Sequence, residues 1–344
     1  MAEHLPLISV VMSVYNSDQF LSEAIESVLH QTLQDFEFII VDDASKDASL
    51  QILENYQKKD NRIHILRNEI NSGLGSSLQR GINASRGRFI ARMDADDISL
   101  PERFEKQINF LFKHPEIKIL GSGVLIVDEK GEKVSQVKFS GTPSILRWNM
   151  LLGSGMIVSH PSVLMERDFI INLRGYSSLR AAQDFELWTR TLWLNPFPIA
   201  NLDDYLLAYR QHGKSTSSAN NTLQESTAIQ IRLEKISQFL EKPVPAEVVL
   251  AYRHPTYAYS NIEECIRLWI ELYCKFIDKF NLNKKERRLI ESEILPLLNK
   301  YSYFPPQKNN IQFRVSFWKL IRLLPRGLAF RALFSKITWG MQRL

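Results

Sequence analysis

Residues 89–103 read FIARMDADDISLPER, an apolar run that ends in three carboxylates and is followed directly by the start of a helix. Side chains alternate along an extended strand, so Asp94 and Asp96 can point to the same side at the carboxyl end of that strand. Hard cations prefer oxygen ligands, and Mg²⁺ is usually held by one or two carboxylates together with substrate phosphates and water. The stretch therefore predicts a site for a divalent cation and a diphosphate.

A second interpretation of these residues is purely structural. Ser99 and Glu102 have the spacing of a capping box, and Asp residues near a helix N-terminus favour the helix dipole without doing any chemistry. Taken alone, the stretch leaves both interpretations open.

The preceding sequence alternates between strand and helix patterns. Short apolar runs at residues 7–14, 36–41 and 62–66 are separated by amphipathic helical patterns, which favours an α/β fold with a mostly parallel central sheet flanked by helices. Ligands of such sheets bind outside the carboxyl ends of the strands. The residues expected at that edge are Tyr15, Asp42, Asp43, Asp94 and Asp96.

Two further segments have distinctive patterns. The turn NSGLGSS at residues 71–77 precedes a helix, where it could receive a phosphate or be a plain loop. Its spacing matches neither the dinucleotide fingerprint nor a P-loop, because no Gly-Lys-Ser/Thr follows. Residues 118–127 and 133–139 flank a turn, which predicts a hairpin in place of another βα unit.

Three polar residues in the second half of the chain are functional candidates, each with a structural alternative. His160 precedes a proline, which moves it away from helical geometry, and a lone histidine is commonly a packed core residue. Asp184 lies at the start of a helical pattern, where it could be only a cap. His212 follows a predicted strand at residues 205–209 and opens a polar loop.

Composition and charge limit the function classes. The chain of 344 residues has room for an enzyme domain and an appendage. It offers no apolar stretch long enough to span a membrane, and its first residues have no signal-peptide pattern. The two cysteines, Cys265 and Cys274, have no CxxC spacing, so we expect a cytoplasmic protein without disulfides or a zinc site.

The predicted domain organisation has three parts. Residues 1–220 form the catalytic α/β domain, residues 221–304 a helical extension, and residues 305–344 a basic amphipathic tail. Residues 311–344 contain seven Lys/Arg and no acidic residue, so the net charge of +5 leaves 5 − 7 = −2 for the remainder.

The tail combines aromatic, apolar and basic residues at helical spacing, which is typical of helices at a membrane surface. We therefore expect peripheral attachment to the inner face of the cell membrane. Packing of the tail on the preceding helices is the alternative. Nucleic-acid binding is disfavoured because no reading module is visible beside the tail.

Several motifs occur in an order that points to one family: ISVVMSVYN at 8–16, SVLHQT at 27–32, VDDASKD at 41–47, RGRFIARMDADD at 86–97 followed by LPERF, HPSVLM at 160–165, AAQDFELWTR at 181–190 and YRQHGKS at 209–215. Together they resemble the inverting nucleotide-sugar glycosyltransferases of family 2, of the type that builds bacterial surface polysaccharides and has the GT-A fold. The resemblance covers residues 5 to about 218.

The resemblance implies roles for individual residues. The backbone around Ser13 and the ring of Tyr15 would frame the nucleotide base. Asp43 would accept a hydrogen bond from the base, with Asp42 supporting the loop. Some members carry an arginine that contacts the base near the position of Gly73; it is absent here, which puts base contacts from that loop in doubt.

The resemblance also implies the reacting groups. Asp94-Ala95-Asp96 matches the DxD motif, so Asp94 would face the ribose or the metal and Asp96 would bind a Mn²⁺ or Mg²⁺ ion that bridges the donor diphosphate. Asp97 is also in the usual pattern, with a less uniform role. Asp184 matches the catalytic base, and His212 matches a histidine that completes the metal shell in some members.

These residue types suit the chemistry. A nucleoside diphosphate leaving group calls for a divalent cation, and an acceptor hydroxyl calls for one positioned carboxylate as general base. We therefore expect a metal-dependent inverting transfer from a UDP-sugar to a glycan or lipid-linked acceptor in surface-polysaccharide synthesis. The alternatives are a sugar-nucleotidyltransferase, whose Gly-rich basic N-terminal signature is lacking here, and a non-catalytic membrane-associated scaffold.

Overall fold

The computed structural model describes residues 5–139, 141–153, 157–213, 221–254, 261–303 and 315–316. The chain forms two compact units. The first comprises residues 1–140 and 156–225, and the second comprises residues 141–155 and 226–344.

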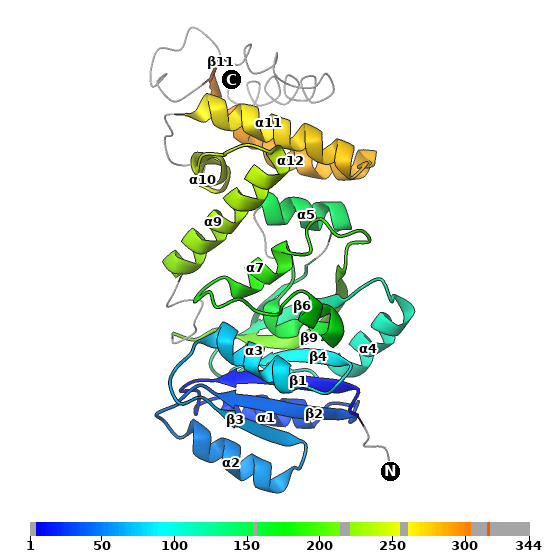
Figure 1. Ribbon diagram of the computed structural model, residues 1–344, viewed down its shortest axis with the longest axis vertical. Coiled ribbons are helices and arrows are strands. Elements are labelled where there is room, and N and C mark those ends of the chain that lie inside the picture. The colour runs from blue at the N-terminus through cyan, green and yellow to red at the C-terminus, as the bar shows by residue number, and fades with distance from the viewer. Residues whose placement is uncertain are drawn as a thin grey trace. The chain divides into compact units, whose positions relative to one another are not determined.

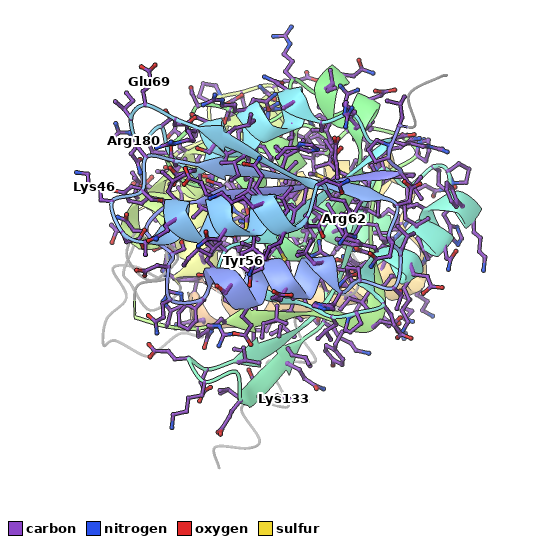
Figure 2. The ribbon with its side chains drawn as sticks, turned by 90° about the horizontal axis from the view of Figure 1, so that it is seen from below. Lys46, Tyr56, Arg62, Glu69, Lys133 and Arg180 are labelled. Carbon is purple, nitrogen blue, oxygen red and sulfur yellow. The ribbon has the colours of Figure 1, made fainter. Side chains whose placement is uncertain are left out.

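The first unit is built on four parallel strands in the order β3-β2-β1-β4. Their bounds are β1 (Ile8–Val14), β2 (Phe36–Asp42), β3 (Ile63–Arg67) and β4 (Phe89–Asp94). Every residue of β2 is buried, because helices cover both faces of the sheet. Helices α1 (Leu21–Leu29) and α2 (Ser49–Lys59) lie on one face, and α3 (Leu74–Ala84) lies on the other (Figures 1 and 2).

The alternating side chains of β1 divide between the two faces of the sheet. Ile8, Val10 and Met12 join the main apolar core with residues of α1 and of α4 (Arg103–Lys113). On the other face, a Cβ atom at Gly81 of α3 would lie 2.5 Å from Cγ1 of Val11, so glycine allows this close approach. The predicted βα alternation is confirmed here.

The remaining strands make the sheet mixed. Strand β8 (Leu164–Glu166) is antiparallel to β4, and β6 (Ile119–Val127) is antiparallel to β8. Strand β9 (Ile199–Arg210) runs parallel to β6, and β5 (Ile98–Ser99) is antiparallel to β9. The predicted hairpin is present, because β7 (Lys133–Val137) pairs antiparallel with β6; its residues are exposed, and Figure 2 shows Lys133 on this outer strand.

The capping-box interpretation of Ser99 and Glu102 is wrong. Ser99 belongs to β5, and its hydroxyl accepts a hydrogen bond from Nε2 of Gln31 across 3.1 Å. Helix α4 begins at Arg103 without a side-chain cap. The buried guanidinium of Arg103 instead donates to the backbone carbonyl of Arg92, which ties α4 to the strand that leads into the carboxylates.

The second unit is mainly helical within its described residues. Its helices are α5 (Pro143–Leu151), most of α9 (Asn221–Leu240), α10 (Glu247–Arg253), α11 (Ile262–Lys279) and α12 (Lys284–Lys300). Trp148 of α5 is fully buried against Phe276 of α11, with ring centroids 5.2 Å apart. Residues 302–303 and 315–316 pair as the short strands β10 and β11.

The helical extension was expected from periodicity, but α5 was not, because its nine residues lie between strand patterns far from the other helices. The domain limits at residues 220 and 304 stay predictions. The tail, apart from residues 315–316, lies outside the described residues. Among the helices that the structure describes, none is long and apolar enough to cross a membrane.

Candidate active site

Strand register brings the predicted residues to one edge of the sheet. Ser13 of β1 pairs with Asp94 of β4 on one side, and Val14 pairs with Asp42 of β2 on the other. Tyr15 follows directly, with 44% of its surface exposed. The loops after β2 and β3 carry Lys46 and Glu69, and the segment before α7 (Gln183–Thr189) carries Arg180; Figure 2 shows these three residues along the same side of the molecule.

Three carboxylates gather where β4 ends. Asp94, Asp96 and Asp97 each place one oxygen within 4.8 Å of the others. Oδ2 of Asp94 accepts a hydrogen bond at 2.5 Å from the guanidinium of Arg92, and Oδ1 forms an ion pair with the same group at 2.5 Å. Arg92 lies two residues earlier, on the same face of the strand. Arg92 is only 3% exposed, so it is an internal counter-ion for this cluster. The sequence pattern did not identify it.

Burial raises the pKa of Asp94 to about 6, against the lowering effect of Arg92, and repulsion from Asp96 adds to the rise. Asp97 is 1% exposed, and burial together with repulsion from Asp94 and Asp96 raises its pKa well above the ordinary range. Without a cation, ionisation of all three carboxylates is therefore unfavourable in these buried surroundings.

His212 comes to the same cluster from 116 residues away in the sequence. Its Nε2 lies 2.9 Å from Oδ2 of Asp96, and its ring packs on Phe20 with centroids 5.0 Å apart. The structure thus brings together the two residues that the resemblance names as metal ligands.

Arg210, at the end of β9, binds the acidic loop through both its backbone and its side chain. Its backbone N–H donates to Oδ1 of Asp97, and its guanidinium donates to the backbone carbonyl of Asp96, both across 2.9 Å. The same buried guanidinium also donates to the carbonyls of Asp128 and Glu129 in the β6–β7 turn. Within the sequence, Arg210 is one more charge beside a polar loop, so only its position in the fold identifies it.

Asp43 is buried and organises the glycine-rich turn. One oxygen accepts from Asn68 Nδ2 at 2.6 Å and from the Ser72 amide at 2.8 Å, and the other accepts from the Gly73 amide at 2.9 Å. The turn therefore uses two of its amides to bind Asp43. A carboxylate has about four acceptor positions, so Asp43 retains capacity for one further donor.

Asp184 lies near the start of α7 (Gln183–Thr189), with a third of its side chain exposed. Burial raises its pKa, against the lowering effects of the Phe185 amide and of Arg92. It is near enough to Asp94 for their charges to repel. His160 lies beside it, with Nδ1 4.0 Å from Oδ2 of Asp184, so this histidine is both a packed residue and a neighbour of the site.

The acidic cluster has the ligand types that a divalent cation prefers. Asp96 and His212 supply an oxygen and a nitrogen ligand, Asp94 lies beside them, and Asp97 Oδ2 is buried without a hydrogen-bond partner among the described residues. The carboxylates suit Mn²⁺ or Mg²⁺, and His212 would add one nitrogen ligand to them.

Comparison with known proteins gives consistent results. The model of Glycosyl transferase family 2 matches residues 9–174. The O-antigen biosynthesis glycosyltransferase WbnJ of Escherichia coli is 33% identical over 242 residues, which cover 69% of this chain and 91% of that protein.

Two solved structures share the fold. Residues 1–349 of S. aureus TarS in complex with UDP-GlcNAc give a TM-score of 0.56 at 17% identity, covering 96% of this chain and 88% of that chain. The mannosyltransferase PcManGT of Pyrobaculum calidifontis, in complex with GDP-Man and Mn²⁺, gives a TM-score of 0.51 at 11% identity, covering 97% of this chain and 88% of that chain.

Proposed function

The chain belongs to glycosyltransferase family 2 and has the GT-A fold, and on this basis we propose that it transfers a sugar from a UDP-sugar to a glycan or lipid-linked acceptor with inversion. The observation that carries the proposal is that His212 contacts Asp96 where β4 ends, while Asp184 lies near enough to the neighbouring Asp94 for their charges to repel. The surface-polysaccharide pathway is supported by the role printed for WbnJ, and the UDP donor by the UDP-GlcNAc complex of TarS.

Asp184 is the proposed general base. An inverting transfer needs a carboxylate that accepts the proton of the acceptor hydroxyl as the oxygen attacks the sugar carbon opposite the diphosphate. The raised pKa of Asp184 makes it a stronger base than an ordinary aspartate. Because attack is direct, no second nucleophilic carboxylate is required.

The other residues are proposed to hold the donor. Asp43 would accept from the nucleotide base, beside the Tyr15 ring and the Ser13 backbone, and Asp94 would face the ribose or the cation. Asp96 and His212 would hold a Mn²⁺ or Mg²⁺ ion, which when bound would neutralise negative charge on the leaving diphosphate.

Screening the purified full-length chain against a panel of nucleotide sugars, with and without Mn²⁺, tests the proposal. We expect metal-dependent release of UDP from one UDP-sugar. Release of pyrophosphate would indicate a nucleotidyltransferase, and the absence of any turnover with added acceptors would favour the scaffold alternative.

The variant Asp184→Asn tests the base. We expect near-normal donor affinity with turnover reduced by roughly 10²–10⁴, the usual contribution of a general base. Collapse of donor affinity with high residual turnover would show that Asp184 has a structural role and is not the base. Asp168→Asn, an exposed aspartate of α6 (Arg167–Asn172), is the matched control.

A further inference from the structure

His160 lies between Asp184 and Tyr176, and its two ring nitrogens face different oxygens. Nε2 is 2.6 Å from the hydroxyl of Tyr176, which is a hydrogen bond. Nδ1 is 4.0 Å from Oδ2 of Asp184, which is within ion-pair range but longer than a hydrogen bond. Catalytic hydrogen bonds are often long before substrate binds and shorten in the complex.

Packing holds the imidazole in this orientation. Its ring meets Tyr176 and Trp188 edge to face, with centroids 5.4 Å and 6.0 Å away. Trp188 follows Asp184 by one helical turn, so both side chains lie on the same face of α7. The backbone of Tyr176 is itself anchored, because its N–H donates to Oε1 of Gln79 in α3 across 2.7 Å.

The surroundings also determine where the protons are. Burial, together with the positive charge of Arg92, lowers the pKa of His160 well below its ordinary range, so the ring is neutral and carries one proton. Burial raises the pKa of Tyr176 above its ordinary range, so the hydroxyl keeps its proton. The charged groups near this pair are Arg92, Asp94 and Asp184.

We propose that Tyr176 and His160 are positioning residues for Asp184. The Tyr176 hydroxyl donates to Nε2 of His160 and thereby keeps the single ring proton on Nδ1, which faces the Asp184 carboxylate. The inference rests on the proposed function, since it assigns partners to the base. The Nδ1–H group orients one carboxylate oxygen and leaves the other for the acceptor hydroxyl. Tautomer control by the second ring nitrogen is a general property of functional histidines.

Two substitutions of His160 separate its two contacts. The amide nitrogen of Asn replaces Nδ1, whereas that of Gln extends toward the position of Nε2. We expect His160→Asn to retain turnover within about tenfold of the native chain, and His160→Gln and Tyr176→Phe to lose at least about tenfold, the rate equivalent of one hydrogen bond. The KM for the donor should not change.

The pH profile of kcat supplies a readout that a purely structural role would not affect. A donor to the ionised carboxylate lowers its pKa, so losing it raises that pKa and moves the acidic limb to higher pH. We expect this displacement in His160→Gln and Tyr176→Phe. The controls are His64→Gln on β3 and Tyr56→Phe on α2, and Figure 2 labels Tyr56. Equal profiles for His160→Asn, His160→Gln and the controls would overturn the proposal.

Nitrogen-15 NMR of the histidines in the unmodified full-length chain tests the tautomer without relying on activity, and the folded His160→Asn variant is used only to assign the signal. The resonance that disappears in His160→Asn belongs to His160. We expect the proton on Nδ1 from pH 6 to 8. A proton on Nε2 would refute the positioning role even if Asp184→Asn confirms the base, whereas a native-like rate for Asp184→Asn would refute the base itself.

Discussion

Arg210 donates from its guanidinium Nε to the backbone carbonyl of Asp96 across 2.9 Å, so a buried arginine on β9 holds the backbone of the residue proposed to bind the metal. The same guanidinium binds the carbonyls of Asp128 and Glu129. A further hydrogen bond reaches Glu23 of α1. One side chain therefore joins the acidic loop, the β6–β7 turn and the first helix.

Replacing this arginine tests its part in shaping the site. Lysine retains the positive charge but lacks the planar set of donors that reaches several carbonyls at once. We expect Arg210→Lys to lower the free energy of unfolding by about 2–3 kcal/mol, since at least one charged hydrogen bond is lost in a buried place. Urea unfolding measures this change.

The same variant should weaken Mn²⁺-dependent binding of UDP, because the Asp96 carbonyl loses its donor. Arg62→Lys is the matched control, since Arg62 pairs with Asp60 at the opposite end of the strands and is labelled in Figure 2. If both variants bind UDP as the native chain does, Arg210 does not organise the acidic loop.

Removing the Asp96 carboxylate tests the metal assignment. We expect Asp96→Ala to abolish transfer and to remove the Mn²⁺-dependent part of UDP binding, because one of few protein ligands is lost. Calorimetry with UDP and Mn²⁺ measures the affinity. Undiminished affinity would contradict the assignment of Asp96 as a ligand, and Asp168→Ala supplies a control on the exposed surface of α6.

The acidic cluster should make the metal-free protein less stable as pH rises. The pKa of Asp94 in the folded chain is about 6, above its ordinary value of 3.8, so between these pH values the folded state binds more protons than the unfolded state. Stability therefore falls as pH rises through that window, by about 3 kcal/mol from this group.

Asp97→Asn provides the variant for this test, because its amide oxygen can still accept from the Arg210 backbone. The raised pKa of Asp97 acts in the same direction. We expect the variant to raise the melting temperature of the metal-free chain at pH 7.5 and to change it little at pH 4, where Asp97 is already protonated. A larger increase at pH 4 than at pH 7.5 would contradict the assigned direction.

Membrane attachment stays a prediction for the tail, of which the structure describes only residues 315–316. Each basic residue near an anionic surface contributes about 1 kcal/mol, so half of the seven could hold the chain there reversibly. We expect salt-sensitive sedimentation with phosphatidylserine vesicles for the full chain, and none for a chain that ends at Gln307. Equal binding by both would refute the assignment.

Local pattern was sufficient for much of this protein. The β-branched runs of β1 and β2, the helices after them and the carboxylates after β4 follow from periodicity and from the positions where apolar runs stop. The ordered motifs indicated the family, and through that resemblance they also indicated Asp184 and His212 as candidate site residues. Each of these inferences depends on residues that are near one another in the chain.

Only the tertiary structure decided which side chains meet. Arg92 and Arg210 look like surface charges in the sequence, yet both are buried beside the acidic cluster. Ser99 has the spacing of a helix cap, but it lies in β5, which pairs with β9. Its hydroxyl accepts a hydrogen bond from Gln31. Tyr176 meets His160 where Gln79 of α3 accepts from its backbone N–H and Trp188 of α7 packs on the imidazole. Such contacts join residues far apart in the sequence, and their energies depend on burial, which no local pattern records.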